Sequence, residues 1–199
     1  MGVSRAMSPR RWSPGRRLLL LALLPVGLAA LGVFGYLLAG ALKGTPAASS
    51  SQVIGFERLD KPAHAVTMPN LTGHGSTGLA NLAGKPIVIN FWSTTCTDCV
   101  AETKALVEVA NSTRGKVNFL GIDTLDVQGL AREFAVKYHI PYPLTFDPNE
   151  VVGTRYGLVG LPMTFFFSPS GKQVLGVNIG GVTVKSLTRI LHELYGNAA

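Results

Sequence analysis

The chain has 199 residues, with 18 Lys and Arg residues against 11 Asp and Glu residues, and its net charge at neutral pH is +7. Six of the basic residues lie in residues 1–43, where no acidic residue occurs, so 12 basic and 11 acidic residues remain for the rest of the chain. The basic excess therefore bears on membrane topology, and we expect no nucleic-acid partner.

The N-terminal segment has the pattern of a membrane anchor. Five arginines precede an uncharged stretch, residues 18–42, and a transmembrane helix needs roughly 20 apolar residues. The positive-inside rule makes residues 1–17 a basic cytoplasmic tail and puts the rest of the chain outside the cytoplasm of a bacterial-type cell. The alternative is a cleaved signal peptide, with candidate cleavage sites at 39–41 and 47–49. Both interpretations export the C-terminal part.

A linker and one folded domain are expected after this anchor. Residues 43–61 begin with small and polar residues without a hydrophobic period, which is typical of a flexible connection. We assign residues 62–199 to a single domain, because their number is usual for one hydrophobic core.

A cysteine pair stands at the centre of this domain. Ile87 to Trp92 is an apolar run typical of a strand buried on both faces. A short polar elbow, Ser93 to Thr95, leads to Cys96 and Cys99, the two cysteines of the chain, and a helix is expected over residues 100–109. Cys96 then lies at a helix N-terminus, where free backbone N–H groups and the helix dipole favour a thiolate, and Cys99 follows one turn later.

Three interpretations of the cysteine pair are open. A zinc site usually needs four ligands, and neither a second C-x-x-C nor a nearby His pair is present. A purely structural disulfide would close a very short loop and so would restrict the unfolded chain little. A redox-active pair fits the spacing best and needs no further cofactor.

The other expected elements alternate between strands and helices. The helix after the cysteines should bury Val100, Leu106, Val107 and Ala110, and a helix over 126–138 should bury Val127, Leu130, Phe134 and Val136 or Tyr138. Short strands are expected at 65–68, 117–122, 142–145, 163–167 and 173–178, a turn at 72–78, and helices at 79–82, 149–156 and 184–194. This order predicts an α/β fold with a mixed sheet covered by helices on both faces.

At this point the sequence resembles a known family. The stretches L-A-G-K-P-I-V-I-N-F-W-S-T-T-C-T-D-C-V-A-E, F-L-G-I-D, H-I-P-Y-P-L-T-F-D-P and G-L-V-G-L-P-M-T-F-F-F-S-P-S-G-K are similar to those of the TlpA/ResA/DsbE group of thioredoxin-like extracytoplasmic thiol-disulfide oxidoreductases. The resemblance implies a thioredoxin fold in which residues 126–156 are the central insertion of this group.

The resemblance also implies roles for residues near the cysteines. Pro162 would be a cis-proline beside the redox pair, and Gly160 and Leu161 would offer backbone to a substrate peptide. Glu102 would move the proton of Cys99, although a solvated helix glutamate is the alternative. Trp92, Thr95, Thr97 and Asp98 would lie where a substrate binds.

Asp98, inside the C-x-x-C motif, is expected to affect the pKa of Cys96. A negative charge inside the motif disfavours the thiolate of Cys96 and raises its pKa, which favours a reductant over a strong oxidant. The sequence also departs from the family, because Thr95 stands where a Trp usually precedes the first cysteine, and the usual proline in or after the motif is absent. These departures bear on substrate recognition and on the redox potential.

The expected reaction is reduction of a disulfide in an exported protein, such as an apocytochrome c awaiting haem, by Cys96 with Cys99 as the resolving thiol. A membrane thiol-electron donor would re-reduce the pair. The opposite direction, oxidation or isomerisation of secreted proteins, uses the same residues. A peroxiredoxin-like peroxidase is less favoured, because its P-x-x-x-T-x-x-C pattern has Ile89 and Ser93 at the Pro and Thr positions, and a copper-handling protein would need a His that reaches the cysteines.

Overall fold

The computed structural model describes residues 55–196 of the chain. In chain order the elements are β1 (Gly55–Pro62), β2 (Thr67–Pro69), β3 (Ser76–Gly78), α2 (Leu79–Leu82), β4 (Ile87–Trp92), α3 (Thr97–Ser112), β5 (Asn118–Thr124), α4 (Gln128–Lys137), β6 (Leu144–Asp147), α5 (Val151–Tyr156), β7 (Met163–Phe167), β8 (Gln173–Ile179) and α6 (Val184–Tyr195).

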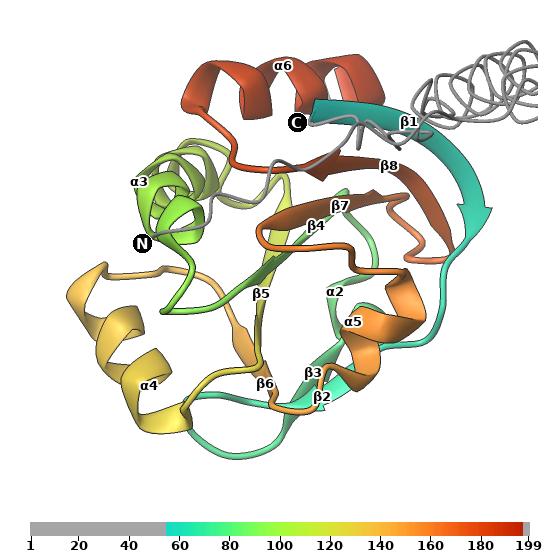
Figure 1. The fold of residues 1–199 in the computed structure, drawn as a ribbon. Coiled ribbons are helices and arrows are strands. Elements are labelled where there is room, and N and C mark those ends of the chain that lie inside the picture. Colours follow the sequence, from blue (N-terminus) through green and yellow to red (C-terminus); the bar gives the residue numbers. More distant parts are fainter. Residues whose placement is uncertain (1–54, 197–199) are drawn as a thin grey trace, which may run out of the picture. The chain divides into compact units, whose positions relative to one another are not determined.

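A six-stranded mixed sheet is the centre of the fold (Figure 1), with the strand order β1-β8-β7-β4-β5-β6. β4, β5 and β6 run parallel to one another, whereas β7 is antiparallel to β4 and β8 is antiparallel to β7. β2 and β3 form a separate two-stranded hairpin. The expected thioredoxin-like arrangement of a mixed sheet with flanking helices is therefore confirmed.

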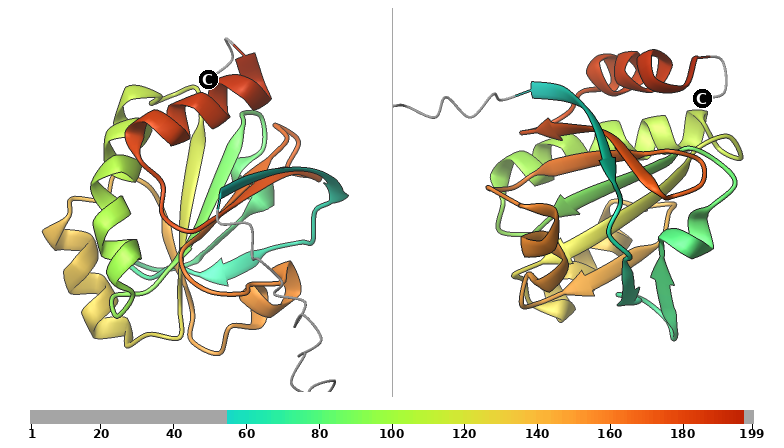
Figure 2. Two further views of the ribbon diagram at one scale, coloured as in Figure 1. Left: turned by 45° about the horizontal axis from the view of Figure 1, so that its top comes forward. Right: turned by 90° about the vertical axis from the view of Figure 1, so that its right-hand side faces the viewer.

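Helices cover both faces of the sheet (Figures 1 and 2). All six residues of β4 are buried, and alternate residues point to opposite faces. Val88 packs in a cluster with residues of α3 and α6, whereas Ile89 and Phe91 pack in a second cluster with residues of α2 and α5. The unbroken apolar run of β4 thus reflects burial on both sides.

Two helices bury different faces from those expected. In α3, Leu106 and Ala110 are buried as predicted, but Val100 and Val107 are only partly buried and Val109 takes the inward place.

In α4 the buried residues are Ala131, Phe134 and Ala135. The predicted burial of Phe134 is confirmed, and Tyr138, the alternative to Val136, is partly buried. Val127, Leu130 and Val136 are 62%, 49% and 70% exposed, so the predicted burial of Val127 and Leu130 was wrong. The buried side of the helix, Ala131, Phe134 and Ala135, packs in one cluster with Trp92 of β4 and Leu144 of β6, and the larger aliphatic side chains stay outside.

The folded domain begins earlier than the sequence indicated. Residues 55–61, which we assigned to the linker, belong to β1, the edge strand that pairs antiparallel with β8 from Gly55–Ile179 to Pro62–Gln173. β1 carries several charged side chains and shows no apolar alternation, because it is an exposed edge of the sheet. The assignment of these residues to a flexible linker is therefore corrected.

The predicted basic tail, the predicted span at 18–42 and the first part of the linker lie outside the described residues. Within residues 55–196, no helix is long and apolar enough to cross a bilayer. The expected turn at 72–78 contains a strand, β3, which pairs with β2. The short helices at 79–82 and 149–156 and the C-terminal helix are confirmed, with α5 ending at Gly157 in the left-handed region.

Candidate active site

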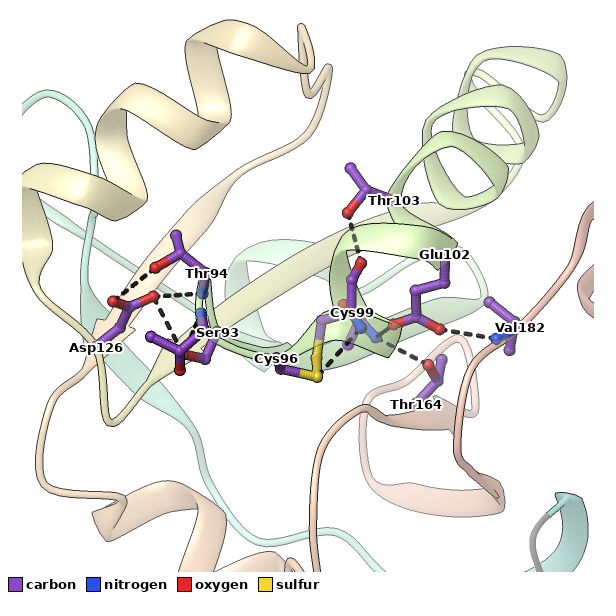
Figure 3. Close-up of a disulfide and its surroundings, with 11 residues drawn as sticks. Ser93, Thr94, Cys96, Cys99, Glu102, Thr103, Asp126, Thr164 and Val182 are labelled. Carbon is purple, nitrogen blue, oxygen red and sulfur yellow. Dashed lines mark hydrogen bonds between the residues drawn. A yellow bond between two sulfur atoms is a disulfide. The ribbon is translucent and has the colours of Figure 1, made fainter.

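The cysteine pair lies where β4 ends and α3 begins (Figure 3). The carboxyl ends of parallel strands are the usual place for a site in an α/β sheet, because the loops there leave the strands in the same direction. Cys96 is the N-cap residue of α3, and its Sγ accepts a hydrogen bond of 3.1 Å from the backbone N–H of Cys99. A negative charge on Cys96 Sγ would therefore be stabilised by the N–H group of Cys99 and by the positive end of the helix dipole.

The two sulfurs form a disulfide and differ in accessibility. Cys96 is partly exposed, whereas Cys99 is 1% exposed and packs in the same cluster as Trp92 and Leu144. An external thiol or disulfide can therefore reach Cys96 and cannot reach Cys99. This asymmetry is what an attacking and a resolving cysteine require.

Glu102 lies inside the protein, one helical turn after Cys99. Its side chain is 3% exposed, Oε1 accepts a hydrogen bond of 2.8 Å from Asn90 Nδ2, and Oε2 accepts one of 2.8 Å from the backbone N–H of Val182. Burial raises the pKa of Glu102 to about 7, with a small rise from Asp98, although the bonds from Val182 and Asn90 pull it down. The alternative of a solvated helix glutamate is therefore wrong.

Asn90 is a site residue that the sequence analysis missed. It is 4% exposed at the middle of β4, and its Nδ2 also contacts Thr164 Oγ1 of β7 at 3.1 Å. A buried amide needs hydrogen-bond partners, and Glu102 and Thr164 provide them. The signal was present in the sequence, because Asn90 is the one polar residue in the apolar run I-V-I-N-F-W.

The segment before β7 contains the predicted cis-proline and packs in part against the cluster that contains Cys99. The Leu161–Pro162 peptide is cis, and Pro162 O accepts a hydrogen bond of 2.9 Å from the N–H of Gly180. Leu161 is partly buried against the cluster that contains Cys99, whereas Gly160 is exposed. The structure therefore brings Leu161 and the redox pair together.

The remaining predicted contact residues differ among themselves. Thr95, Thr97 and Asp98 are exposed next to Cys96 and are available to a partner. Trp92, in contrast, is 4% exposed, and its ring stacks against Phe134 of α4 with 5.0 Å between centroids. The predicted substrate contact of Trp92 is therefore corrected, because its side chain is buried in the cluster that contains Cys99 and Phe134.

A carboxylate of the loop after β5 holds the elbow that leads to Cys96. Asp126 accepts hydrogen bonds from Thr94 N, Thr94 Oγ1 and Ser93 Oγ (Figure 3). Burial of the Asp126 carboxyl alone would raise its pKa, but the hydrogen bonds from Thr94 and Val127, together with the neighbouring Asp123 side chain, outweigh burial and lower it. No local sequence pattern indicates this contact, because Asp126 and Thr94 are 32 positions apart along the chain. In the part of the chain that the structure describes, no group of three or more His, Cys, Asp and Glu side chains is placed to hold a metal ion.

Comparisons with known proteins agree with this geometry. Residues 59–175 match the model of the AhpC/TSA family. The chain is 33% identical over 127 residues to the thiol:disulfide interchange protein DsbE of Pseudomonas fluorescens biotype C, an alignment that covers 63% of this chain and 67% of that protein. It is 26% identical over 117 residues to the thiol-disulfide oxidoreductase ResA of Oceanobacillus iheyensis, covering 58% of this chain and 60% of that protein.

Solved structures give the same result for the fold. A secreted Mycobacterium tuberculosis disulfide oxidoreductase homologous to Escherichia coli DsbE superposes with a TM-score of 0.58 at 28% identity, over 65% of this chain and 96% of that one. A DsbF homologue of Corynebacterium diphtheriae gives a TM-score of 0.66 at 24% identity, over 73% of this chain and 96% of that one. The chain therefore belongs to the AhpC/TSA family, among its thioredoxin-like thiol-disulfide oxidoreductases of the DsbE and ResA type.

Proposed function

We propose that this protein reduces disulfides of exported proteins through its Cys96–Cys99 pair, as a membrane-anchored reductant outside the cytoplasm. The observation that carries the proposal is the accessible Cys96 Sγ at the N-terminus of α3, disulfide-bonded to a buried Cys99 one turn along the helix.

The reaction follows from this geometry. In the reduced protein, the thiolate of Cys96 attacks one sulfur of a partner's disulfide, and a mixed disulfide forms while the other partner sulfur leaves as a thiolate and takes up a proton. Cys99 then attacks Cys96 Sγ, and the second partner sulfur leaves. The partner has gained two electrons and two protons, and Cys96 and Cys99 are joined.

Glu102 is suited to the second step. Cys99 must lose its proton before it can attack, and water has little access to a residue that is 1% exposed. A carboxyl group one helical turn away, with its pKa raised by burial to about 7, is ionised enough to accept that proton near neutral pH and can release it again.

The direction of electron flow is inferred from charge. Asp98 lies exposed between the cysteines, so its carboxylate acts against the helix dipole and disfavours the thiolate of Cys96. A less stable reduced form of that kind is a better electron donor. The pair then needs a membrane thiol-electron donor to be reduced again after each turnover.

Export of the domain is supported by the uncharged stretch at 18–42 and by the relative from M. tuberculosis, which is described as secreted. An apocytochrome c is the substrate class that we favour, because the haem-attachment motif C-x-x-C-H needs both thiols reduced. Oxidation or isomerisation of secreted disulfides is the second candidate, since it would use the same two sulfurs in the opposite direction.

A mixed-disulfide trap tests the proposal. The reduced full-length protein in detergent is mixed with a peptide that contains a single C-x-x-C disulfide, and peptide thiols are counted. The wild-type protein should release two thiols per molecule, Cys99→Ser should stop at a covalent adduct with the peptide, and the matched variant Cys96→Ser should form no adduct. An adduct on Cys96→Ser, or no release by the wild type, would overturn the assignment of the two cysteines.

A further inference from the structure

Asp123 is a buried acid for which the reaction above has no use. It stands near the end of β5, is 0% exposed, and neither of its carboxyl oxygens has a hydrogen-bond partner within residues 55–196. An ionised carboxylate in such a place would be costly, because it has lost water and gained no donor. Asp123 is therefore protonated near neutral pH, in agreement with its pKa, which burial and then the charge of Asp126 raise to about 8.

The position of Asp123 connects it to the redox pair. It is the register partner of Trp92 in the parallel ladder between β4 and β5, so the two side chains share one face of the sheet. On that face Trp92 packs in the cluster that contains Cys99. The side chain of Asp123 thus lies on the same face of the sheet as the cluster that contains Cys99.

Asp126, three residues further on, is the carboxylate that Asp123 influences. Its oxygens receive the N–H and the hydroxyl of Thr94, the hydroxyl of Ser93 and the N–H of Val127. Four donors on one side chain are the environment of an ionised carboxylate. Through Thr94 and Ser93 this carboxylate fixes the elbow immediately before Cys96.

We propose, on the basis of the function above, that Asp126 is a positioning residue for Cys96 and acts as a pair with Asp123. The pair holds one proton, which stays on Asp123 and leaves Asp126 ionised to anchor the elbow. When base removes that proton, a second negative charge appears on the cysteine side of the sheet and disfavours the thiolate of Cys96. The pair thereby limits how reactive the reduced protein becomes as the pH rises.

The other titratable groups near this face of the sheet are hydrogen-bonded to other partners or are exposed to solvent. Glu102 of α3 is bonded to Asn90 and Val182, and the carboxylate of Asp147 on β6 accepts the N–H groups of α5. On α4, Arg132 donates to Leu71 O and Glu133 is exposed. Asp126 is thus the acid whose charge acts on Asp123.

The test is the pH dependence of Cys96 alkylation in the reduced protein, from pH 5 to pH 10, with iodoacetamide as the probe. The wild-type curve should show a second inflection near pH 8, which should be absent in Asp123→Asn, a neutral mimic of the protonated acid. Rates for the two proteins should agree at pH 6, and Asp123→Asn should react about two- to three-fold faster between pH 8 and pH 9. Glu133→Gln, which removes an exposed acid of α4, is the control and should follow the wild type.

The positioning role has its own readout. Asp126→Ala should slow alkylation of Cys96 at every pH, whereas Asp126→Asn, which keeps an acceptor oxygen for Thr94, should restore much of the rate at pH 6. A wild-type curve with a single inflection, or equal rates for Asp126→Ala and the wild type, would overturn the proposal, even if Asp123→Asn failed to fold. Because alkylation needs no partner protein, these outcomes are independent of the peptide-reduction assay that tests the proposed function.

Discussion

Asn90 Nδ2 donates a hydrogen bond of 2.8 Å to Glu102 Oε1, and this bond joins the central strand of the sheet to the helix that carries both cysteines. The second oxygen of Glu102 is held by the N–H of Val182, in the loop that follows β8. The acid next to the buried cysteine therefore has a fixed orientation, set by two segments far from it in the sequence. The hydrogen bonds from Asn90 and Val182 also lower the pKa of Glu102, so its ionisation depends on both contacts.

Replacement of Glu102 by Gln should slow the resolving step without blocking the first attack. The variant keeps the shape of the side chain but cannot accept the proton of Cys99, and a positioned general base typically contributes about 10²-fold or more. The two steps separate in a stopped-flow reaction with a chromogenic aromatic disulfide, in which Cys96 releases the first chromophore and Cys99 the second. The second phase should lose its dependence on pH near 7, the pKa of Glu102.

The control for this experiment is Glu108→Gln, an exposed acid on the same helix. Its two phases should match those of the wild type. A second phase in Glu102→Gln that kept its rate and its pH dependence would remove Glu102 from the reaction.

Replacement of Asn90 by Leu should raise the pKa of Glu102 further, because the bond from Asn90 is one of the contacts that lower it. The pH midpoint of the second phase should move upward, and the free energy of unfolding should fall by about 1.5–3 kcal/mol, as expected for loss of a hydrogen bond to a charged group. Thr164→Val is the matched control, since it removes the other contact of Asn90 and leaves Glu102 bonded. Equal midpoints in Asn90→Leu and Thr164→Val would contradict the coupling.

Replacement of Asp98 by Asn should lower the pKa of Cys96 and make the pair more oxidising. The side chain is exposed, so solvent screens its charge, and we expect a shift of about half a pKa unit, or roughly 15 mV in potential at low salt. Alkylation rates against pH give the first quantity, and equilibration with glutathione gives the second. Asp98→Glu, which keeps the charge, should stay close to the wild type, and an unperturbed or acidic pKa of Cys96 in the wild type would refute the role of Asp98.

Asp123 should also make stability depend on pH. Because burial raises its pKa from 3.8 to about 8, the folded protein keeps a proton that the unfolded chain releases from about pH 4 upward. The stabilisation linked to that proton is complete below pH 4 and is lost progressively up to pH 8. The stability of Asp123→Asn relative to the wild type should therefore rise with pH between pH 4 and pH 8 in urea unfolding, by about 1.4 kcal/mol per pH unit where the slope is steepest. A difference that stays constant over this range would mean that Asp123 is not protonated in the fold.

The sequence predicted most of what lies close together along the chain. The apolar run Ile87–Trp92 and the spacing of Cys96 and Cys99 indicated a buried strand, an elbow and a helix N-terminus, and all three are present. The role of Asn90 was visible only as one polar residue in an apolar run, and the partner of that residue could not be deduced.

What the sequence could not give depends on contacts between distant residues or on close packing. Asp126 contacts Thr94 across 32 positions, and no local pattern marks such a pair. The inward face of α4 consists of Ala131, Phe134 and Ala135, whereas side-chain hydrophobicity alone favours the larger Val127 and Leu130, which are exposed. The sequence of β1 resembles a linker, since an exposed edge strand with charged residues lacks the apolar alternation that identifies strands.

The central claim is that the Cys96–Cys99 pair is a reductant, and its equilibrium reduction potential tests that claim most directly. The full-length protein is equilibrated with dithiothreitol or glutathione buffers, and the fraction of reduced pair is measured with a thiol-alkylating reagent, with Cys96→Ser as the blank. A potential of about −270 mV or lower, in the range of thioredoxin, is the predicted result. A potential near about −120 mV, in the range of the strong oxidant DsbA, would contradict the account and make this protein an oxidant of exported thiols.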